Sequence, residues 1–444
     1  MNTKVVKFGG SSVADANQIK KVKEILYSED SRKYCVVSAA GKRNSNDEKI
    51  TDLLISAFEY KSDENKQDEI LNKVYNRYKN IIDELNINFD LDAEFLNIKR
   101  IAKTETKVDY LASRGEFLSA KIIALYVDGI FLDMENLIIF DDDRKVNYEI
   151  SYENINREIK NIEKVNNNPK IVIPGFYGSD KTGNIITFSR GGSDITGALV
   201  SRAMEVEVYE NWTDVSGVMF EDPRLVKDAK PIEYITYAEL RELSYMGASV
   251  LHEETLYPVS KAGIPVHILN TNRPNDKGTM IVSKIPDNIK RNTVTGIAGK
   301  KGFSSILLHK ALMNEEIGFL ARLLNIFDKQ RISVEHCPTG IDTISLIVRT
   351  NLLDEKLDSI LSEIKRDLTP DELTVENNLS VIAIVGEGLY CSKDITAKVF
   401  DIFSEENILV RMIDYGSSGN NIIVAVSDDD YERAMIALNK LNIF

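Results

Sequence analysis

The chain has 444 residues, of which 43% are hydrophobic and 28% charged, and its formal net charge is −14 at pH 7. This length and composition predict two or three globular domains with sizeable cores. The acidic balance argues against a general nucleic-acid or anionic-membrane binder but leaves room for a local basic pocket. Three cysteines are too few for a disulfide framework, and no apolar run or leader indicates membrane insertion or export. We therefore expect a cytoplasmic enzyme.

The first 285 residues alternate short apolar strands with amphipathic helices. The strand "VVKF" precedes a helical pattern at Ile19, Val22, Ile25 and Leu26, and "YCVVSAA" follows as the next strand. Further along, "KIVIPGFYG", "EVYENWTD" and "IPVHILN" are typical of strands, and "ITGALVSRAM" is typical of a helix. This alternation predicts a layered α/β fold with a largely parallel sheet. The highly charged stretch 61–108 has helical periodicity and indicates a solvated helical face.

The last third of the chain contains an internal repeat. "ARLLNIFDKQRISVEHCPTG", from Ala321, aligns at a constant offset with "AKVFDIFSEENILVRMIDYG", from Ala397. Each unit has the pattern strand, helix, strand, turn, strand, helix, which predicts a small α+β module present twice. Paired modules behind an α/β domain favour ligand sensing, with a dimerisation scaffold as the alternative. The segment "KIPDNIKRNTVTG" is typical of a connector between the two regions.

A lysine and two glycines end the first predicted strand. Lys7 precedes Gly9, Gly10 and Ser11, whereas the lysine of the common phosphate-binding loop follows its glycines. The glycines allow backbone amides to approach an anion closely, and a helix that follows offers a positive N-terminal end. By itself, this pattern is a weak signal, because a lysine near a strand end is usually a solvated tip.

A second glycine pair, in "TFSRGGSDITGALVSRA", also ends a strand and opens a helix. Ser193 can cap that helix, and Asp194 in its first turn suits the helix dipole. Arg190 can hold a carboxylate in a planar, bidentate way. Two such turns on one sheet would form two anion cradles at the carboxyl edge, where open α/β sheets bind ligands. Phosphoryl transfer requires this kind of convergence.

Two further stretches have a functional and a structural interpretation. Thr213, Asp214 and Arg224 lie in "NWTDVSGVMFEDPR", which can form a nucleotide pocket or a plain surface turn. Glu116, in "ASRGEFLSAKI", lies near an expected helix start and can bind an ammonium group or cap the helix. "HEETL" lacks the second histidine of a zinc motif, and the four histidines show no ligand spacing, so no metal site is predicted.

Taken together, these stretches closely resemble the aspartokinase family. The markers, in the family's order, are "VKFGGSSVAD", "KITDLL", "SRGEFLSAKI", "TFSRGGSDITGAL", "WTDVSGVMFEDPR", "YMGASVLH" and "GIPVHILNT". The repeat is similar to the tandem ACT domains of that family. The resemblance implies an amino-acid-kinase-type layered α/β fold with a largely parallel central sheet, followed by two α+β, ferredoxin-like ACT modules. The implied organisation is a catalytic domain at 1–285, a linker at 286–300, and ACT domains at 301–375 and 376–444.

The resemblance also implies a reaction, which is ATP-dependent phosphorylation of the side-chain carboxylate of L-aspartate, with Mg²⁺ bridging the β- and γ-phosphates. It assigns catalytic roles to Lys7 and Asp194. It assigns nucleotide binding to Lys7, Gly9, Gly10, Ser11, Thr213, Asp214, Arg224 and Ser249. It assigns substrate binding to Thr51, Glu116, Arg190, Gly191, Gly192 and Ser193. Ser249 stands where the family has a lysine, and the match at Thr51 requires a gap after "VVSAAGK".

Regulation is implied by the first repeat, where "MNEEIGFLARLL" and "ISVEHCPTG" resemble the effector loops of lysine-regulated aspartokinases. The candidate effector residues are Met313, Gly318, Phe319, Leu320, Glu335 and Thr339. In the alternative interpretation, Phe319 and Leu320 belong to the core and Glu335 to the surface. Lysine is the first choice of inhibitor, with threonine, alone or together with lysine, left open. ACT pairs of this type imply a homodimer or a larger assembly.

Two other functions remain open on the sequence alone. The first is a kinase of the same fold that acts on glutamate, acetylglutamate or carbamate, against which the double ACT tail and "KFGGSSV" weigh. The second is an amino-acid sensor whose kinase domain has lost activity, as Ser249 suggests. The presence of Lys7, Arg190 and Asp194 argues against that loss.

Overall fold

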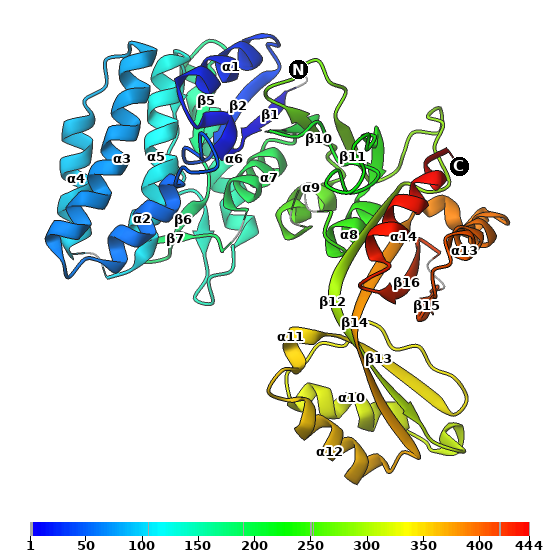
Figure 1. The fold of residues 1–444 in the computed structure, drawn as a ribbon. Helices are drawn as coiled ribbons and strands as arrows, with labels where there is room; N and C mark the ends of the chain where they lie inside the picture. Colours follow the sequence, from blue (N-terminus) through cyan, green and yellow to red (C-terminus); the bar gives the residue numbers. More distant parts are fainter. Residues whose placement is uncertain are drawn as a thin grey trace. The chain divides into compact units, whose positions relative to one another are not determined.

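The computed structural model describes residues 3–104, 106–189, 191–248, 251, 253–416 and 419–443 (Figure 1). The chain divides into two compact units. The N-terminal unit comprises Met1–Val218, Glu233–Tyr237 and Val250–Ile285, and the C-terminal unit comprises Met219–Ile232, Ala238–Ser249 and Pro286–Phe444. Two short segments that precede residue 250 therefore group with the C-terminal residues, which the sequence pattern did not indicate.

An eight-stranded sheet forms the centre of the N-terminal unit, in the order β3-β5-β2-β1-β8-β10-β11-β9. Among the strand pairs that the described residues form in this sheet, only β10–β11 is antiparallel, so the predicted layered α/β fold with a largely parallel sheet is confirmed. The strands are β1 (Lys4–Phe8), β2 (Arg32–Val37), β3 (Ile130–Phe131), β5 (Ile171–Pro174), β8 (Val208–Thr213), β9 (Tyr234–Thr236), β10 (Val266–Asn270) and β11 (Thr279–Val282).

Helices and a small second sheet complete the N-terminal unit. The helices are α1 (Ala16–Tyr27), α2 (Ile50–Glu59), α3 (Glu64–Leu85), α4 (Leu91–Thr104), α5 (Val108–Tyr126), α6 (Tyr148–Val165), α7 (Gly192–Ala203) and α9 (Tyr257–Ala262). The second sheet contains β4 (Ile139–Phe140), β6 (Tyr177–Asp180) and β7 (Ile185–Thr187). Short 3-10 turns cover Gly10–Val13 (η1) and Glu253–Leu256 (η2).

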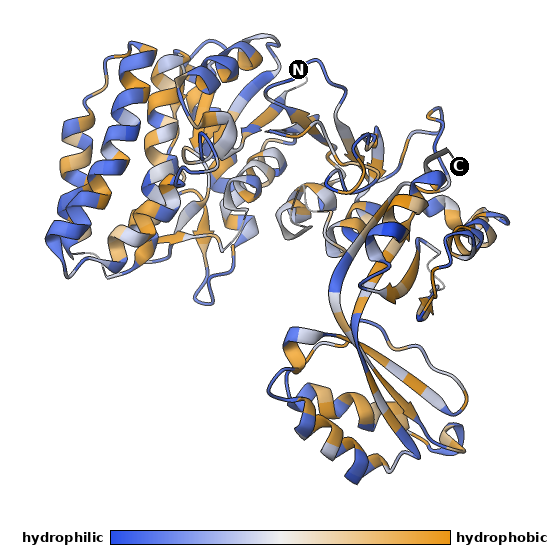
Figure 2. Cartoon of the chain, viewed as in Figure 1, coloured by the Kyte–Doolittle hydropathy of each residue, from blue (hydrophilic) through white to orange (hydrophobic). Residues whose placement is uncertain are grey.

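The charged stretch 61–108 forms α3 and α4, which stand beside α2 and α5 (Figure 1). Apolar residues of α3, such as Ile70, Val74 and Ile81, are buried in the main core of this unit. The other residues of α3 are mostly hydrophilic, and much of the ribbon of α3 and α4 is blue in Figure 2. An amphipathic helix folds this way because its apolar stripe covers the core while its charges stay in water. Arg77 is an exception, because this cation is only 7% exposed.

The C-terminal unit is built on a five-stranded antiparallel sheet in the order β13-β12-β14-β16-β15. Its strands are β12 (Gly296–His309), β13 (Thr343–Arg349), β14 (Glu372–Val385), β15 (Met412–Asp414) and β16 (Asn421–Ser427). The helices are α8 (Tyr237–Tyr245), α10 (Phe319–Lys329), α11 (Thr350–Leu353), α12 (Leu357–Leu368), α13 (Ile395–Glu405) and α14 (Tyr431–Leu438). Three more 3-10 turns are η3 (Met313–Glu315), η4 (Glu387–Cys391) and η5 (Asn439–Ile443).

The two repeats share their longest strands. β12 and β14 each have 14 residues, and they pair along almost their whole length (Figure 1). The second half of β12 pairs with β13, whereas its first half pairs with the end of β14 that also binds β16. The segment 296–300, expected as part of a connector, is therefore strand, and it completes the sheet of the second repeat. None of the described helices is long and apolar enough to cross a membrane.

A buried ion-pair network joins three neighbouring strands of the N-terminal sheet. Glu210 on β8 is 1% exposed, and it accepts hydrogen bonds from Arg32 Nε at 2.8 Å and from Trp212 Nε1 at 2.9 Å. Lys4 Nζ on β1 lies 3.0 Å from the same carboxylate. A carboxylate so deeply buried is tolerated because each of its oxygens has a charged or polar partner.

We expect Glu210→Gln to lower the free energy of unfolding by about 3 kcal/mol, because it leaves the buried guanidinium of Arg32 without its main counter-charge. Urea unfolding followed by circular dichroism measures the change. The control is Glu205→Gln, which breaks an ion pair with Arg202 in which Glu205 is 80% exposed. The control substitution should lower the free energy of unfolding by less than about 1 kcal/mol, because surface ion pairs usually contribute no more than that. An equal effect of the two substitutions would contradict the structural role of the network.

Candidate active site

The two glycine motifs meet at the carboxyl edge of the central sheet. Lys7, near the end of β1, is 6% exposed, and its Nζ lies 2.5 Å from Asp194 Oδ1 in the first turn of α7. Asn211 on β8, the register partner of Lys7, donates to the same Asp194 oxygen from Nδ2 at 2.7 Å. The sheet thus presents a buried cation at its edge, with one carboxylate and one amide that hold it in place.

The first glycine turn lies directly beside this pair. The Gly9 amide donates to the Trp212 carbonyl at 3.0 Å, and a Cβ added at Gly9 would lie 3.8 Å from Lys7 Nζ. A Cβ at Gly10 would lie 3.3 Å from the Cα of Gly41, so a larger residue would push two backbones apart. A side chain at Gly10 would therefore press on the neighbouring backbone, whereas a Cβ at Gly9 would make only ordinary van der Waals contact with the lysine.

The structure after these glycines differs from the predicted helix. Gly10–Val13, which includes Ser11, forms a short 3-10 turn, and α1 begins only at Ala16. The side chain of Asp15 caps α1 by accepting from the Gln18 amide at 2.9 Å. An anion at the first turn would therefore meet Lys7 and loop amides rather than the N-terminus of a full α-helix. The shift arises because the tight Gly9-Gly10 turn first packs against the neighbouring loop.

The second glycine turn starts α7, but Ser193 does not cap it as predicted. The N-cap is Gly191, whose φ of 56° is in the left-handed region that glycine adopts readily. A Cβ at Gly192 would lie 2.5 Å from Phe176 Cδ2, so this position has no room for a side chain. The Ser193 hydroxyl instead shares a 2.7 Å hydrogen bond with that of Ser38, which follows β2.

Glu116 lies well inside α5 and not near a helix start, so it cannot act as a dipole cap. It is 6% exposed, and its Oε2 atom has no hydrogen-bond partner among the described residues. Burial raises the pKa of this carboxyl to about 8, although the Ala39 amide acts in the opposite direction. A buried acid with an unused oxygen can receive a ligand's ammonium group.

Thr51 is half-buried in the first turn of α2, next to the contact between α2 and α5. A Cβ at Gly115 would lie 2.6 Å from Ala39 Cβ and 3.2 Å from Ile50 Cγ2. The helices therefore approach closely beside the residues that precede Thr51 and Glu116. Both candidate substrate residues thus adjoin the loop that follows β2.

The candidate nucleotide residues beyond the first glycine turn belong to different parts of the chain. Thr213 ends β8, and its hydroxyl donates to Asp214 Oδ1 at 3.2 Å. Asn270 Nδ2 donates to the Asp214 carbonyl at 3.2 Å and so holds this turn. Arg224 belongs to the C-terminal unit, where it forms a 2.6 Å ion pair with Asp222. Two other candidates, Arg190 and Ser249, lie outside the described residues.

Two contacts of the site were missed by the sequence reasoning. Asn211 is one residue before the conspicuous Trp212, and only the β1–β8 register reveals that it faces Asp194. Ser12, beside Ser11, forms a buried 2.7 Å hydrogen bond through its hydroxyl with Thr271 after β10, a contact that the sequence alone did not indicate. The repeated strand-then-polar pattern could have indicated both positions, since neighbouring parallel strands end at one edge.

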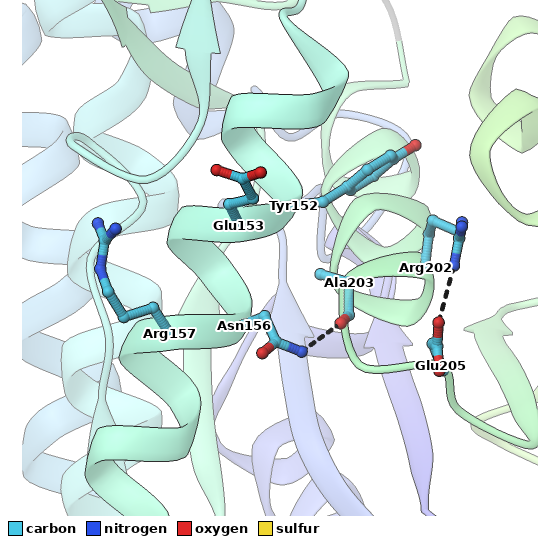
Figure 3. Close-up of a pocket in the computed structure, with 7 residues that line it drawn as sticks. All are labelled: Tyr152, Glu153, Asn156, Arg157, Arg202, Ala203 and Glu205. Carbon is cyan, nitrogen blue, oxygen red and sulfur yellow. Dashed lines mark hydrogen bonds and ion pairs between the residues drawn. The ribbon is translucent and has the colours of Figure 1, made fainter.

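A surface pocket of about 480 Å³ lies elsewhere, between α6 and α7 (Figure 3). Asp194 is in the first turn of α7, whereas the pocket residues Arg202 and Ala203 are in its last. Several of its polar groups are already paired, since Arg202 bonds to Glu205 and Asn156 donates to the Ala203 carbonyl. This pocket is separate from the Lys7 site.

The candidate effector residues lie around the start of α10 and the segment before β13. Met313 and Phe319 are buried in the core of the first repeat, whereas Leu320 is 37% exposed. Gly318 caps α10 with a φ of 76°. The interpretation of Phe319 as a core residue is therefore correct, and that of Leu320 as a core residue is wrong.

Glu335 is not a free surface residue, as the alternative interpretation had it. Its side chain is 4% exposed and accepts from Arg349 Nε at 2.9 Å, with Tyr245 Oη as a second donor. Thr339 forms an isolated bridge with Ile344 just before β13. The Glu335 carboxylate is thus held in place by Arg349 and Tyr245.

Comparison with known families defines the class of protein. Residues 2–270 match the amino acid kinase family, and residues 382–441 match the ACT domain family. The first match contains both glycine turns and all candidate residues around Lys7. The fold is that of an amino acid kinase that carries an ACT domain, and the protein is a kinase.

Relatives that match along nearly the whole chain identify the family within this class. Aspartokinase 3 of Bacillus subtilis (strain 168) is 38% identical over 98% of this chain and 97% of its own. The crystal structure of Clostridium acetobutylicum aspartate kinase is 43% identical, with a TM-score of 0.88 over 99% of this chain and 100% of that one. The chain belongs to the aspartokinase family, as its motifs indicated.

A more distant relative has been solved in two liganded states. The Escherichia coli aspartokinase III structure with aspartate and ADP is 26% identical, with a TM-score of 0.74 over 100% of both chains. The structure of that enzyme with lysine and aspartate has a TM-score of 0.75 at 26% identity and covers 99% of both chains.

The raised pKa of Glu116 has a measurable consequence. Its ordinary value is 4.5, so between about pH 4.5 and 8 the folded state binds a proton that the unfolded state has lost. Stability of the ligand-free protein should therefore fall as pH rises through this window. We expect Glu116→Gln to be more stable than the parent by a margin that grows from pH 5 to pH 8 and then levels off.

Urea unfolding at several pH values measures this margin. One pKa unit corresponds to about 1.4 kcal/mol, so the margin should reach a few kcal/mol. Glu84→Gln, at an exposed position of α3, is the control and should show no such pH dependence. A margin for Glu116→Gln that is constant across the range would mean that this carboxyl titrates normally.

Proposed function

We propose that the chain transfers the γ-phosphoryl group of ATP to the side-chain carboxylate of L-aspartate. The observation that carries this proposal is the buried Lys7–Asp194–Asn211 cluster at the sheet edge, between two glycine turns. Phosphoryl transfer depends mainly on positioning and on neutralising charge at the transferred group. The ADP and aspartate present in the E. coli aspartokinase III structure support these two ligands.

The chemistry needs no general base. An aspartate carboxylate is already ionised at neutral pH, so its oxygen can attack the γ-phosphorus directly while the bond to the ADP oxygen breaks. Lys7 would stabilise the charge on the transferred group, and Asp194 and Asn211 would keep its ammonium in place. The amides around Gly9, Gly10 and Ser11 would approach the phosphates, and Thr213 and Asp214 would complete the nucleotide site.

The protein must also hold the anionic aspartate close to the anionic phosphates of the nucleotide. Glu116, with its unused carboxyl oxygen, would receive the ammonium group of aspartate. Arg190 would hold a carboxylate of the substrate bidentately, and Thr51 together with Gly191–Ser193 would line the same pocket. Ligand binding would then return Glu116 to its ionised form, since a nearby ammonium lowers a carboxyl pKa.

Mg²⁺ would neutralise the β- and γ-phosphates of the nucleotide. The one candidate catalytic carboxylate, Asp194, already bonds to Lys7 and Asn211, which leaves it a limited share in metal binding. Mg²⁺ commonly binds to substrate phosphates and retains several waters. We therefore assign the ion to phosphate oxygens and water, with protein groups in a minor role.

Regulation belongs to the C-terminal unit in this proposal. A free amino acid, with lysine as first choice and threonine as the alternative, would bind the first repeat near Met313, Gly318, Phe319, Leu320, Glu335 and Thr339. The lysine in one E. coli aspartokinase III structure supports the first choice. We also propose that the chain forms a homodimer or larger assembly through its ACT modules.

The assay for this proposal is ATP-dependent hydroxamate formation with aspartate and, in parallel, with glutamate. Lys7→Met should lower kcat for aspartate by about 10²- to 10³-fold, as expected when one stabilising donor is removed. Lys20→Met, at an exposed position of α1, is the control and should retain full activity. Full activity of Lys7→Met would refute the role of Lys7. A preference for glutamate would favour a related kinase, and no turnover at all would favour a sensor.

The effector proposal has its own test, which is inhibition of the aspartate assay by lysine and by threonine. Glu335→Gln should raise the lysine concentration for half inhibition by about tenfold or more, because a hydrogen bond to a charged group contributes about 1.5–3 kcal/mol. The matched control is Glu376→Gln, in the same sheet but 45% exposed at its side chain. An unchanged inhibition curve for Glu335→Gln would remove this residue from the effector site.

A further inference from the structure

The loop between β2 and α2 touches both glycine turns of the candidate active site. The Ser38 amide donates to the Phe8 carbonyl at 3.2 Å, and the Ser38 hydroxyl bonds to Ser193 at 2.7 Å. Three residues later, the Gly41 amide donates to the Gly10 carbonyl at 2.9 Å. A Cβ at Gly41 would lie 2.5 Å from the carbonyl carbon of Gly10, so the two backbones are in direct contact.

The same loop also sets the start of α2. The Ile50 amide donates to the Ala40 carbonyl at 3.3 Å, and Thr51 follows in the first turn of the helix. Between Gly41 and Ile50, the chain makes an excursion of polar and charged residues. Without a restraint, such an excursion would leave the distance between the glycine turn and Thr51 variable.

Arg77 supplies a restraint from α3, outside the candidate site itself. It is 7% exposed, and its Nη1 atom donates to the Gly41 carbonyl at 3.1 Å and to the Ala14 carbonyl at 3.4 Å. Its Nη2 atom donates to Asp47 Oδ2 at 2.5 Å. One guanidinium therefore joins a helix to the turn after β1, to the turn after β2 and to the excursion beyond it.

Asp47 is held from a second side by Arg43. The Arg43 amide and Nε each donate to Asp47 Oδ2 at 2.9 Å, and Nη2 donates to Oδ1 at 3.2 Å. These bonds from Arg43, with a further contribution from Arg77, hold the pKa of the Asp47 carboxyl well below its usual range. The carboxylate is thus ionised at neutral pH, and the excursion is closed by charge-assisted hydrogen bonds.

The identity of residue 77 matters for this arrangement. A guanidinium has donors in a rigid planar fork, whereas a lysine ammonium is a compact charge on a flexible stem. Lysine at this position would keep the positive charge near Asp47 but could not hold two carbonyls and a carboxylate in the same geometry. The buried charge itself is tolerated because Asp47 neutralises it.

We propose that Arg77, supported by Asp47, is a positioning residue for phosphoryl transfer. It fixes the Gly41–Gly10 contact and thereby the spacing between the glycine turn near Lys7 and the α2 end that carries Thr51. This inference rests on the proposed function, in which the glycine turn near Lys7 holds the nucleotide and the α2 end with Thr51 holds the acceptor. A displacement of about 1 Å between two reacting groups can cost about 100-fold in rate.

The kinetic test compares Arg77→Lys with Lys73→Gln in the full chain. Lys73 is on the same helix, 50% exposed, in a 3.8 Å ion pair with Glu48, so its loss should leave both kinetic parameters unchanged. Arg77→Lys should lower kcat/KM for aspartate by about 30- to 100-fold, with a raised aspartate KM as well as a lower kcat. A merely structural role would lower the amount of active enzyme and leave KM unchanged.

A second variant keeps the test valid if Arg77→Lys does not fold, as judged by circular dichroism. Asp47→Asn preserves the shape of the side chain and removes its charge, so it should raise the aspartate KM in the same direction but by a smaller factor. Normal kcat and KM in a folded Arg77→Lys, or in a folded Asp47→Asn where Arg77→Lys is unfolded, would overturn the inference.

Limited trypsin digestion gives a readout that does not need activity. The loop contains the cleavage sites Lys42, Arg43 and Lys49, all of which are exposed or half-exposed. Cleavage there, mapped by mass spectrometry, should be at least several-fold faster in Arg77→Lys than in the parent and in Lys73→Gln. Equal cleavage rates would overturn the inference. Faster cleavage in the variant, together with an inactive parent, would support the restraint on the loop and refute the proposed function.

Discussion

The contact between the backbones of Gly10 and Gly41 is the constraint on which the candidate active site depends. β1 and β2 are parallel neighbours, so the turns that follow them leave the sheet side by side at the same edge. Those turns can lie against each other because Gly41 carries no side chain, since a Cβ there would lie 2.5 Å from the carbonyl carbon of Gly10. From this contact the first turn continues to α1 and the second to α2, which sets the separation between the turn near Lys7 and the end of α2 that carries Thr51.

The two buried cations described at this edge each have a carboxylate partner. Lys7 is held by Asp194, which Asn211 also contacts, and Arg77 is held by Asp47 and two carbonyls. Glu116 differs, because one of its oxygens has no partner among the described residues and its pKa is raised. In the proposed reaction, which gathers two anions and one ammonium, the cation would already be in position and the acid would be ready to accept its partner. Regulation would act on this arrangement from a C-terminal unit whose two repeats share the continuous strands β12 and β14.

Much of the fold could be predicted from local patterns. Buried parallel strands such as "VVKF" and "YCVVSAA" are apolar runs bounded by polar residues, and the repeat aligned residues such as Ile326 and Ile402 that are core positions in both modules. Predictions that depended on three-dimensional packing were less successful. Ser193 was expected to cap α7, but Gly191 takes that place and the serine hydroxyl bonds to Ser38 across the site. Glu116 was expected near a helix start, yet it lies inside α5, where Gly115 allows α2 and α5 to approach closely.

The sequence by itself determined the family, the layered α/β class, the tandem repeat and the pair of glycine motifs. These features can be predicted from local periodicity and from residue types with a specific structural use, such as glycine where a side chain has no room. Only the tertiary structure decided that Asn211 faces Asp194, that the start of β12 completes the second repeat's sheet, and that Arg77 holds the loop after β2. Such contacts join residues far apart in the chain, and their register and direction follow from strand pairing and helix packing, which no short stretch of sequence specifies.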